Sequence, residues 1–556
     1  MMTKTRQKAP RAIDLYSGVG GWALGLRLAG IEVVASYERW GVANETNFKN
    51  NHHQAQTVDI RRLELADLPS DIDIVVGSPP CTQFSFSNRG GSGDLADGLK
   101  DVIQFLSIVE HLKPKVWAME NVPRMAKIIE AELRKGGVLH RFSSLGVQAH
   151  IVNTADYGVP QRRMRCIAGN FDFALLQSYR ATLVPPTLGD VVDSLAAKVV
   201  TDPIYGMTLP QSELRDHIEE TPLSEEEVRI NRAAKTTHTV YNAMAFPDQL
   251  NRPVRTITAT CTRVSRESIV IATADTPTRF RRLTIRERAS LQGFPITFQF
   301  YAEVYGHKQQ MVGNAIPPAF TYYLAHALLE TPVDAVPPLF EVGRDLTCPS
   351  PPATDAMPNR AGSKYAEDRR FRFAIPSLQL KSGVRFELVN RVASQPITWG
   401  VDFYFGTSKS IISLDLSEGL QSRVLALFST ALIKRVAGAL GGLHDFLKIA
   451  DLDGMQRIWS RRGLGTTTPF MLLDQLDLTG SSLASVLADD EHFAKWVLGM
   501  VINLEYGHDE ARCLPGLGKL ANNASLVVAG LLVGSTANAY LTHPQAKARN
   551  QLQLVA

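Results

Sequence analysis

Residues 13–23 read IDLYSGVGGWA, an apolar run that leads into a turn rich in glycine. The run at 12–16 predicts a buried strand and residues 20–29 predict a helix, with the glycines in the turn between them. Glycine lets a chain turn tightly and lets a ligand approach the backbone closely. This order favours a nucleotide-like cofactor, and a purely structural glycine turn is the alternative.

Strand and helix patterns continue to alternate from this turn outward. Strand-like runs follow at 31–36, 71–77 and 116–120, and apolar residues recur at helical spacing across 102–112. This alternation predicts a parallel sheet that is covered by helices on both faces.

Two acidic residues follow strand ends close to the glycine turn in the sequence. Glu38 ends the second strand, where a carboxylate can accept both hydroxyls of an adenosine ribose. Asp59 follows another short apolar run and could accept from an adenine amino group. The turn also satisfies the dinucleotide pattern Gly-x-Gly-x-x-Ala at 18–23, so a nicotinamide cofactor stays open at this point.

The whole chain is too long for one compact core and too weakly charged to indicate a partner. Its 556 residues predict two or three domains, and its net charge of +4 permits nucleic-acid binding without arguing for it. Five cysteines without C-x-x-C spacing argue against a zinc ribbon or a disulfide framework and favour a reducing compartment. Residues 1–11 lack the apolar region of a signal peptide, and residues 520–542 are too polar for a membrane span, which favours a buried helix there.

A rigid loop follows the predicted strand at 71–77. Residues 78–85 read SPPCTQFS, so two prolines stiffen the approach to Cys81, just beyond a strand end where open α/β sheets place their ligands. A thiol nucleophile needs a partly exposed, electropositive site. A lone cysteine is more often a small buried side chain, but the rigid loop and its position favour a catalytic role.

Two further groups of polar residues could complete a site. Glu120 ends the next predicted strand and would lie near Cys81 if the two strands are neighbours; a helix cap or a surface acid is the alternative. Residues 161–165 read QRRMR, and Arg163 and Arg165 would point to one side of an extended segment. Such a pair can bind a carbonyl oxygen and a phosphate, or can form a solvated face.

Taken together, these segments resemble the DNA (cytosine-5) methyltransferase family, in family order, over residues 14–329. The glycine turn is similar to the family's first motif, and Pro79-Pro80-Cys81 is similar to its nucleophile motif. Thr82 departs from the family, which often has glutamine directly after the cysteine; here Gln83 follows. The remaining similarities are Glu120-Asn121-Val122, the QRRMR segment, a block from RRLTIRE at 281–287 to LQGFP at 291–295, and VGNAIPP at 312–318.

The resemblance implies an α/β fold with the Rossmann-like, doubly wound sheet of S-adenosylmethionine-dependent methyltransferases. It implies a catalytic domain at 1–185 plus 305–345 and an inserted target-recognition domain at 186–304. Beyond a proline-rich linker at 346–364, we expect an additional α+β domain at 365–556 of unknown function. The cofactor would be S-adenosyl-L-methionine, bound by Asp14, Tyr16, Ser17, Gly18, Gly20, Gly21, Glu38, Asp59, Ile60, Pro79, Asn314 and Ala315.

The reaction implied by the resemblance uses Cys81 as a covalent nucleophile on carbon 6 of cytosine. Glu120, if protonated, would donate to ring nitrogen 3, and Arg163 or Arg165 would hold the carbonyl at carbon 2. The base must leave the duplex to reach these groups. The residues expected to contact DNA are Gln83, Ser85, Gln161, Arg255, Thr256, Thr258 and Thr260. The three threonines would share one face of a strand at 255–263, and a plain strand with threonines on its wet face is the alternative.

We expect a monomer in the cytoplasm, bound to double-stranded DNA at the nucleoid and not to a membrane. A cognate restriction endonuclease or other defence proteins are the further partners that the resemblance suggests, because such enzymes commonly protect host DNA. An RNA cytosine-5 methyltransferase and a non-catalytic DNA-binding family member are the alternatives; a nicotinamide oxidoreductase gives no reason for the later motifs. The basic stretches 364–372 and 457–462 suggest further binding, although charge runs are usually solvated faces.

Overall fold

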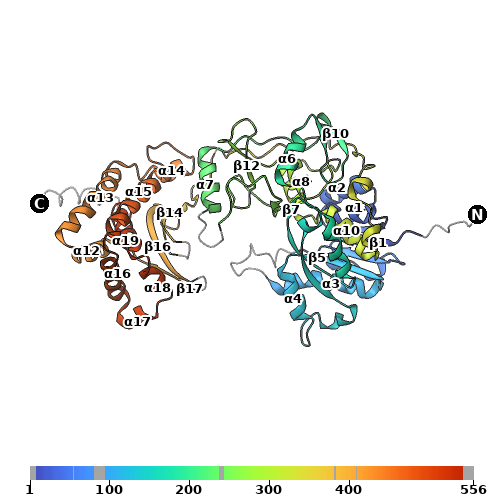
Figure 1. Ribbon diagram of the computed structural model, residues 1–556, viewed down its shortest axis with the longest axis horizontal. Coiled ribbons are helices and arrows are strands. Elements are labelled where there is room, and N and C mark those ends of the chain that lie inside the picture. Colours follow the sequence, from blue (N-terminus) through green and yellow to red (C-terminus); the bar gives the residue numbers. More distant parts are fainter. Residues whose placement is uncertain are drawn as a thin grey trace, which may run out of the picture. The chain divides into compact units, whose positions relative to one another are not determined.

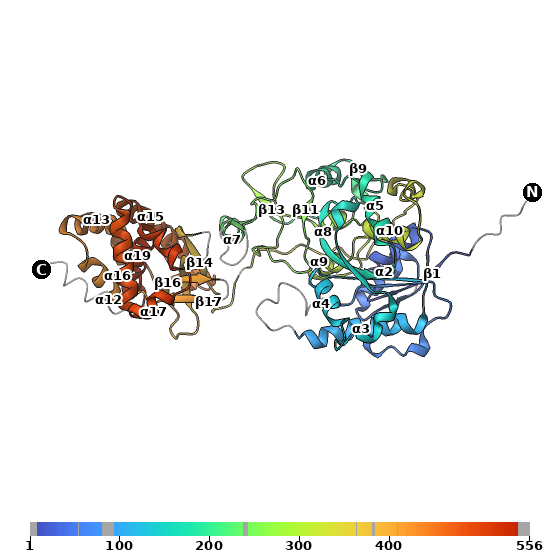
Figure 2. The same cartoon turned by 60° about the horizontal axis from the view of Figure 1, so that its bottom comes forward.

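The computed structural model describes residues 8–53, 55–80, 94–236, 243–362, 364–380, 384–407 and 410–542. The chain divides into two compact units (Figure 1, Figure 2). The first consists of Met1–Asn231 with Ala245–Arg360, and the second of Arg232–Met244 with Ala361–Ala556.

A seven-stranded sheet in the order β3-β2-β1-β4-β5-β8-β6 forms the centre of the first unit (Figure 1). The strands predicted from the apolar runs are all present, so these predictions are confirmed. The sheet contains β1 (Arg11–Leu15), β2 (Glu32–Glu38), β3 (Ala55–Thr57), β4 (Ile74–Gly77), β5 (Val116–Asn121), β6 (Gln148–Asn153) and β8 (Met164–Gly169).

The prediction of a parallel sheet is wrong for one strand, and the sheet is mixed. The five strands from β1 to β5 pair in parallel, but β8 runs antiparallel to both β5 and β6. Parallel neighbours need a crossover of a dozen or more residues. Only residues 154–163 join β6 to β8, so the chain turns back directly and pairs antiparallel.

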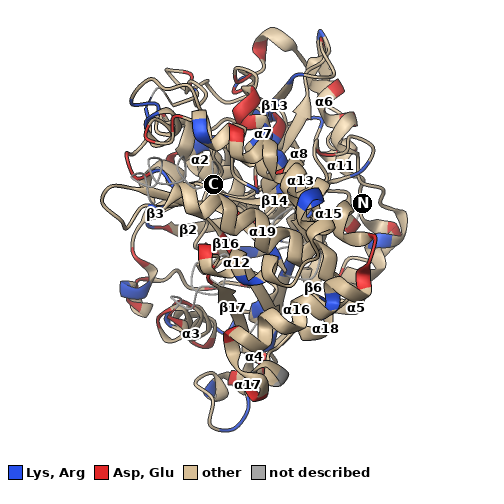
Figure 3. Cartoon of the chain, turned by 90° about the vertical axis from the view of Figure 1, so that its left-hand side faces the viewer, with Lys and Arg blue, Asp and Glu red and all other residues tan. Residues whose placement is uncertain are grey.

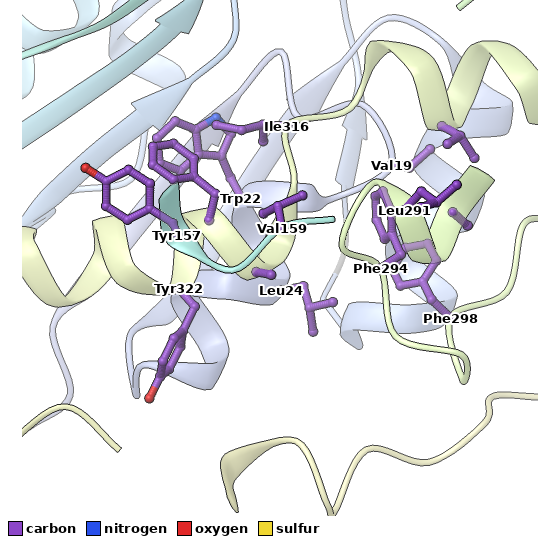
Figure 4. Packing of buried hydrophobic residues seen from close by; sticks show 14 of the residues in the cluster. Val19, Trp22, Leu24, Tyr157, Val159, Leu291, Phe294, Phe298, Ile316 and Tyr322 are labelled. Carbon is purple, nitrogen blue, oxygen red and sulfur yellow. The ribbon is translucent and has the colours of Figure 1, made fainter. Parts of the chain in front are cut away.

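One face of the sheet packs against α1 (Gly21–Leu28) and α10 (Pro318–Leu328). Ala12 and Ala118 point to this side, and Figure 4 shows some of the side chains that fill it, including Trp22 of α1. A Cβ added to Gly25 would lie 2.1 Å from Thr321 Oγ1, so glycine is what allows α1 and α10 to approach.

The opposite face packs against α3 (Leu95–Leu112) and α4 (Arg124–Glu132). Alternate strand residues such as Ile13, Val75 and Trp117 point to this side. Helices therefore cover both faces, as the doubly wound arrangement requires. The carboxyl ends of β1, β2, β4 and β5 meet at one edge, where the candidate site residues lie.

The rest of the first unit consists of short elements joined by irregular chain. Helix α7 (Glu225–Thr236) begins in this unit, and its residues from Arg232 onward belong to the second unit. The other short elements are α2 (Gly41–Asn51), β7 (Gln161–Arg162), α5 (Phe173–Ser178), α6 (Leu188–Ala196), β9 (Val199–Thr201), β10 (Thr208–Pro210), β11 (Val254–Arg255), β12 (Val270–Ala272), β13 (Phe280–Arg282), α8 (Ile285–Leu291), α9 (Tyr305–Asn314) and α11 (Leu339–Val342).

The second unit pairs a four-stranded antiparallel sheet with a layer of helices. The sheet order is β14-β15-β16-β17, and α15 and α19 contact its strands. A Cβ on Gly530 of α19 would lie 2.2 Å from the ring of Phe386, so this helix lies very close to the sheet. The elements are β14 (Arg372–Gln379), β15 (Arg385–Arg391), β16 (Thr398–Thr407), β17 (Ser410–Leu414), α12 (Glu418–Ala426), α13 (Thr430–Ile449), α14 (Met455–Trp459), α15 (Pro469–Ala488), α16 (Glu491–Tyr506), α17 (His508–Cys513), α18 (Leu517–Ala521) and α19 (Ala524–Leu541).

Helix α19 is the one helix in the described ranges that is long and apolar enough to cross a membrane. It carries no charged residue and is uniformly tan in Figure 3. However, 83% of this segment is buried inside the protein. The interpretation of residues 520–542 as a buried helix is therefore confirmed.

Candidate active site

The glycine turn leaves β1 with three residues in the left-handed region of φ. Tyr16, Gly18 and Gly20 have φ angles of 56°, 51° and 87°. A Cβ on Gly20 would lie 2.1 Å from Oδ1 of Asn47 in α2, whereas no described atom lies within 4 Å of a Cβ on Gly18. The turn is therefore closed against α2 on one side and open at Gly18, where a ligand can approach the backbone.

Two buried polar side chains at this turn make no hydrogen bond of ordinary geometry with the described residues. These are Asp14, through both carboxyl oxygens, and Ser17, through its hydroxyl. Burial raises the pKa of Asp14 well above its ordinary value, the Glu38 carboxylate adds to the rise, and the backbone amide of Ala23 opposes it. A buried carboxyl without a donor fits a ligand that brings N–H or O–H groups. S-adenosylmethionine carries an ammonium group and two ribose hydroxyls, so it fits these residues.

The Glu38 carboxylate is already oriented by two backbone amides. It accepts from Gly18 N at 3.1 Å and from Trp40 N at 2.9 Å. An ionised carboxylate has about four acceptor positions, so capacity remains for further donors such as ribose hydroxyls.

Three other residues expected at the cofactor have roles within the protein. Asp59 caps the short 3-10 helix Ile60–Arg62 by accepting from Arg61 N at 3.1 Å, and Ile60 is buried. The Tyr16 hydroxyl donates to the backbone carbonyl of Asp101 at 3.2 Å. These contacts hold the side chains beside the turn in fixed positions.

The segment at 313–316 returns to the glycine turn. A Cβ on Gly21 would lie 2.3 Å from Ile316 O, and a Cβ on Gly313 would lie 2.2 Å from Ala259 N. The same short segment thus touches the glycine turn on one side and the Thr-rich segment on the other. Asn314 is exposed and Ala315 is half-buried, so both can be reached by a ligand.

The chain that precedes Cys81 is attached to the neighbouring strand. β4 and β5 are neighbours, with Gly77 opposite Met119, so the condition that would bring Glu120 near the nucleophile loop holds. Asn121 Nδ2 donates to Pro79 O at 3.1 Å. Cys81 itself, and with it Gln83 and Ser85, lies outside the described residues.

Glu120 forms an ion pair with Arg165. Arg165 Nε lies 2.7 Å from Glu120 Oε1, and the two side chains are 13% and 8% exposed. Both partners are mostly shielded from water, which strengthens the attraction between their charges. The neighbouring Cys166 is buried, and burial together with the Glu120 carboxylate raises the pKa of its thiol to about 12. Cys166 thus stays a neutral thiol and does not compete as a nucleophile.

Arg163 has different contacts from Arg165. Its guanidinium donates to three backbone carbonyls, those of Ile257 at 3.1 Å, Gly313 at 3.0 Å and Ala315 at 3.2 Å. The expected alternation of Arg163 and Arg165 on one side of a continuous strand is wrong, because β7 ends at Arg162 and β8 begins at Met164. We therefore assign Arg163 to joining the segments around the site, and we keep Arg165 as the candidate beside the substrate.

Gln161 also joins segments and is not available to DNA. It is completely buried; its amide donates to Leu291 O and to the side chain of Gln292, and its carbonyl accepts from Ile257 N at 3.0 Å. The expectation of a DNA contact at Gln161 is thus corrected.

The Thr-rich segment is not the strand that its alternating pattern predicts. Only Val254–Arg255 forms a strand, β11, which pairs with β7. Beyond it, side chains take up the backbone groups: Arg163 binds Ile257 O, Arg288 binds Thr258 O at 2.8 Å, and Arg282 binds Cys261 O at 3.1 Å. A backbone whose polar groups are satisfied by side chains has no need of a strand partner.

The polar side chains of this segment also bind within the protein. Arg255 pairs with Asp248 at 2.8 Å, Thr256 Oγ1 donates to Arg162 O at 3.0 Å, and Thr258 Oγ1 donates to Thr260 O at 3.0 Å. Thr256 and Thr258 are half-buried and Thr260 is exposed, so their contacts with DNA stay predictions.

The sequence reasoning missed a buried ionic cluster behind the Thr-rich segment. Glu220 binds both Arg282 and Arg263, and Asp216 binds Lys308 at 2.5 Å. No periodicity signals such pairs, because the partners lie far apart in the chain. Asn121 and Gln292 were also missed, although both lie in quoted motifs; Gln292 Nε2 donates to Ala315 O at 2.5 Å.

The chain is similar to known proteins over the residues that form most of the first unit. The family model of the C-5 cytosine-specific DNA methylases matches residues 11–330. The chain is 28% identical to the Type II methyltransferase M.NgoPII of Neisseria gonorrhoeae, over 58% of this chain and 96% of the relative. It is 28% identical to the Type II methyltransferase M.FnuDI of Fusobacterium nucleatum, over 58% and 95%. A crystal structure of the S. pombe Dnmt2 methyltransferase matches 58% of this chain and 98% of its own, with 19% identity and a TM-score of 0.43. The protein belongs to the C-5 cytosine-specific DNA methylase family.

Proposed function

We propose that this protein transfers a methyl group from S-adenosylmethionine to carbon 5 of a flipped cytosine in a specific DNA sequence, through a covalent adduct with Cys81. The observation that carries the proposal is the hydrogen bond from Asn121 to Pro79 O. It ties the chain two residues before Cys81 to the residue next to Glu120. The Arg165–Glu120 ion pair and the family membership support the same reaction.

Cys81 would supply the covalent step. Carbon 5 of cytosine is a poor nucleophile, and addition of a thiolate to carbon 6 places electron density at carbon 5. When bound, S-adenosylmethionine supplies an electrophilic methyl group. Loss of the proton from carbon 5 then allows the Cys81–carbon 6 bond to break, which restores the aromatic ring and the thiolate.

Glu120 and Arg165 would bind the polar edge of the base. Glu120 can accept from the exocyclic amino group, and in its protonated form it can donate to ring nitrogen 3 as negative charge builds there. Arginine carries five N–H donors. Nη1 of Arg165 donates to Met164 O and Nε lies in the ion pair with Glu120, so the Nη2 group is the donor that we assign to the carbonyl at carbon 2.

The residues at the glycine turn would hold the cofactor. Asp14 and Ser17 have buried polar atoms that make no hydrogen bond of ordinary geometry with the described residues, and Glu38 has acceptor capacity for the ribose hydroxyls. We assign the adenine amino group to Asp59. Tyr16, Gly18, Gly20, Gly21, Ile60, Pro79, Asn314 and Ala315 would line the remainder of the site.

We further propose that residues 1–185 with 305–345 act as the catalytic domain and 186–304 as the target-recognition domain. Residues 346–364 would link these to the additional domain at 365–556. A monomer that acts on double-stranded DNA in the cytoplasm, in restriction–modification or host protection, fits this assignment. The relatives are named Type II methyltransferases, which supports a restriction–modification role. A cognate endonuclease would then be the protein's partner.

A trapped adduct tests the proposal. Wild-type protein, S-adenosylmethionine and duplex DNA that carries 5-fluorocytosine should give a complex that resists denaturation, because fluorine cannot leave as a cation. Cys81→Ser should give no such complex and no methyl transfer, while its affinity for the cofactor stays. Bisulfite sequencing of DNA from an expressing host identifies the target sequence for the assay. If wild type gives no adduct on a duplex that it methylates, covalent attack is wrong; if it methylates RNA and not DNA, the substrate class is wrong.

A further inference from the structure

The main part of the second unit, residues 361–556, lies outside the residues that match the family. In this unit, backbone and side-chain hydrogen bonds bring together the two basic stretches of the sequence, residues 364–372 and 457–462. Tyr365 N donates to Ser460 O at 2.9 Å, Arg462 Nε donates to Tyr365 O at 2.6 Å, and Arg461 Nη1 donates to Gly362 O at 2.5 Å. Residues nearly a hundred positions apart thus form one surface. We call it the arginine surface, made of Lys364, Arg369, Arg370, Arg457, Arg461 and Arg462.

Aromatic rings hold part of the arginine surface in place. The Arg369 guanidinium lies 3.9 Å from the ring centre of Tyr365 and 3.5 Å from that of Trp459, and it donates to Trp459 O at 2.7 Å. Arg461 lies 5.1 Å from the ring centre of Tyr365. Stacked guanidinium groups lose less freedom when they bind a partner.

Positive charge concentrates on this surface. Residues 364–370 and 453–462 contain its six Lys and Arg residues and three acids, Glu367, Asp368 and Asp453, which leaves an excess of three positive charges. The whole 556-residue chain has an excess of only four. Lys364, Arg370, Arg457 and Arg462 are exposed, so their charged groups are accessible to a partner.

We propose that the arginine surface binds the phosphodiester backbone of duplex DNA outside the target sequence. The proposal rests on the proposed function, because that activity brings the first unit onto the same polyanion. Phosphate contacts give affinity without sequence information. A second phosphate-binding surface in the same chain raises the effective concentration of DNA at the catalytic unit.

Neutralising the exposed arginines of the full-length protein tests the proposal. The variant Arg370→Gln/Arg457→Gln/Arg462→Gln is compared with Lys434→Gln/Lys448→Gln/Lys495→Gln, which removes three exposed positive charges from other helices of the same unit. Binding is measured against salt, with a short duplex that holds little beyond the target and with a duplex extended on both sides. We expect the arginine variant to lower the slope of log affinity against log salt by about 2 to 3 on the extended duplex only. The kcat at saturating DNA should stay unchanged.

Several outcomes decide between this proposal and others. Arg370→Lys/Arg457→Lys/Arg462→Lys should restore most of the slope, since charge is what phosphates require. Equal changes in the arginine and lysine variants would mean that net charge alone acts, and no change in either would also overturn the proposal. If the arginine variant loses more affinity for duplex RNA than for duplex DNA, the partner of this surface is RNA and the proposal is wrong. If the wild type binds the extended duplex more tightly than the short one but transfers no methyl group, the proposed function is wrong and this inference stands.

Discussion

The two sides of the candidate site are built in different ways. On the sheet side, Glu120 and the chain before Cys81 are carried by β4 and β5, whose backbones pair in register. On the other side, which we propose recognises the target and call the recognition side, the backbone beyond Arg255 is held by buried side chains such as Arg163 and Arg288. A strand-supported position tolerates the loss of one side chain, whereas a segment held by side chains can be released by a single substitution. Chemistry and recognition can therefore change separately.

The largest effect is expected on the sheet side, from Glu120→Gln. The amide keeps the shape of the side chain, but it cannot act as an acid and it weakens the pair with Arg165. We expect kcat for methyl transfer to fall by about 10²- to 10⁴-fold. The rates of amide hydrogen exchange in β5 should stay unchanged. Glu130→Gln makes the same chemical change on the exposed side of α4 and should have no effect. A Glu120→Gln enzyme within tenfold of wild type would remove Glu120 from the reaction.

On the recognition side, Arg163→Met should release the Thr-rich segment. Three buried carbonyls lose a charged donor, which costs about 3 kcal/mol of local stability. Amide hydrogen exchange at 256–261 and 313–316 should become about 10²-fold faster, while the amides of β4 and β5 keep their protection. Arg163→Lys should recover part of the loss.

Arg162→Met is the matched control, because it removes the neighbouring, exposed arginine. If Arg163→Met accelerates exchange equally in β4 and β5, the sheet side and the recognition side are not stabilised independently. If exchange is unchanged at 256–261, other side chains suffice to hold that segment.

The same difference explains how far the sequence could be interpreted. β1, β2, β4 and β5 carry their own apolar runs, so they could be predicted, and Glu120 could be placed at the end of a strand beside the Cys81 loop. The direction of β8 depends on a short connection, and the break at Arg163 depends on carbonyls of Ile257 and Gly313 that lie far away in the chain. Local periodicity does not record such partners. It predicted a strand at 255–263 because alternation cannot show that side chains take the backbone groups.

The smallest effect is expected at the cofactor turn, from Asp14→Asn. The folded protein holds the proton of Asp14 at pH values where an unfolded chain has lost it, because burial raises the pKa from its ordinary 3.8. Stability therefore falls as pH rises from 3.8 through the folded pKa, and the full cost of a buried carboxylate is present above it. At pH values above the folded pKa of Asp14, and without ligand, Asp14→Asn should raise the Tm by about 2 °C or more. Affinity for S-adenosylmethionine should fall about tenfold, because the ligand's ammonium group loses a charged partner.

Asp193→Asn, on the exposed side of α6, controls for the loss of one negative charge. The expected rise in Tm and the expected fall in affinity for S-adenosylmethionine together distinguish a role at the cofactor from a role in the fold. A residue that only stabilises the fold would lower the Tm when it is replaced, and a residue without a role at the cofactor would leave the affinity unchanged. A ligand-free Asp14→Asn protein that melts lower than wild type across the pH range, with unchanged affinity, would show that Asp14 serves the sheet and not the ligand. The carboxyl end of β1 would then depend on a buried side chain for its stability, as the recognition side does, although the backbone of β1 is paired on both sides.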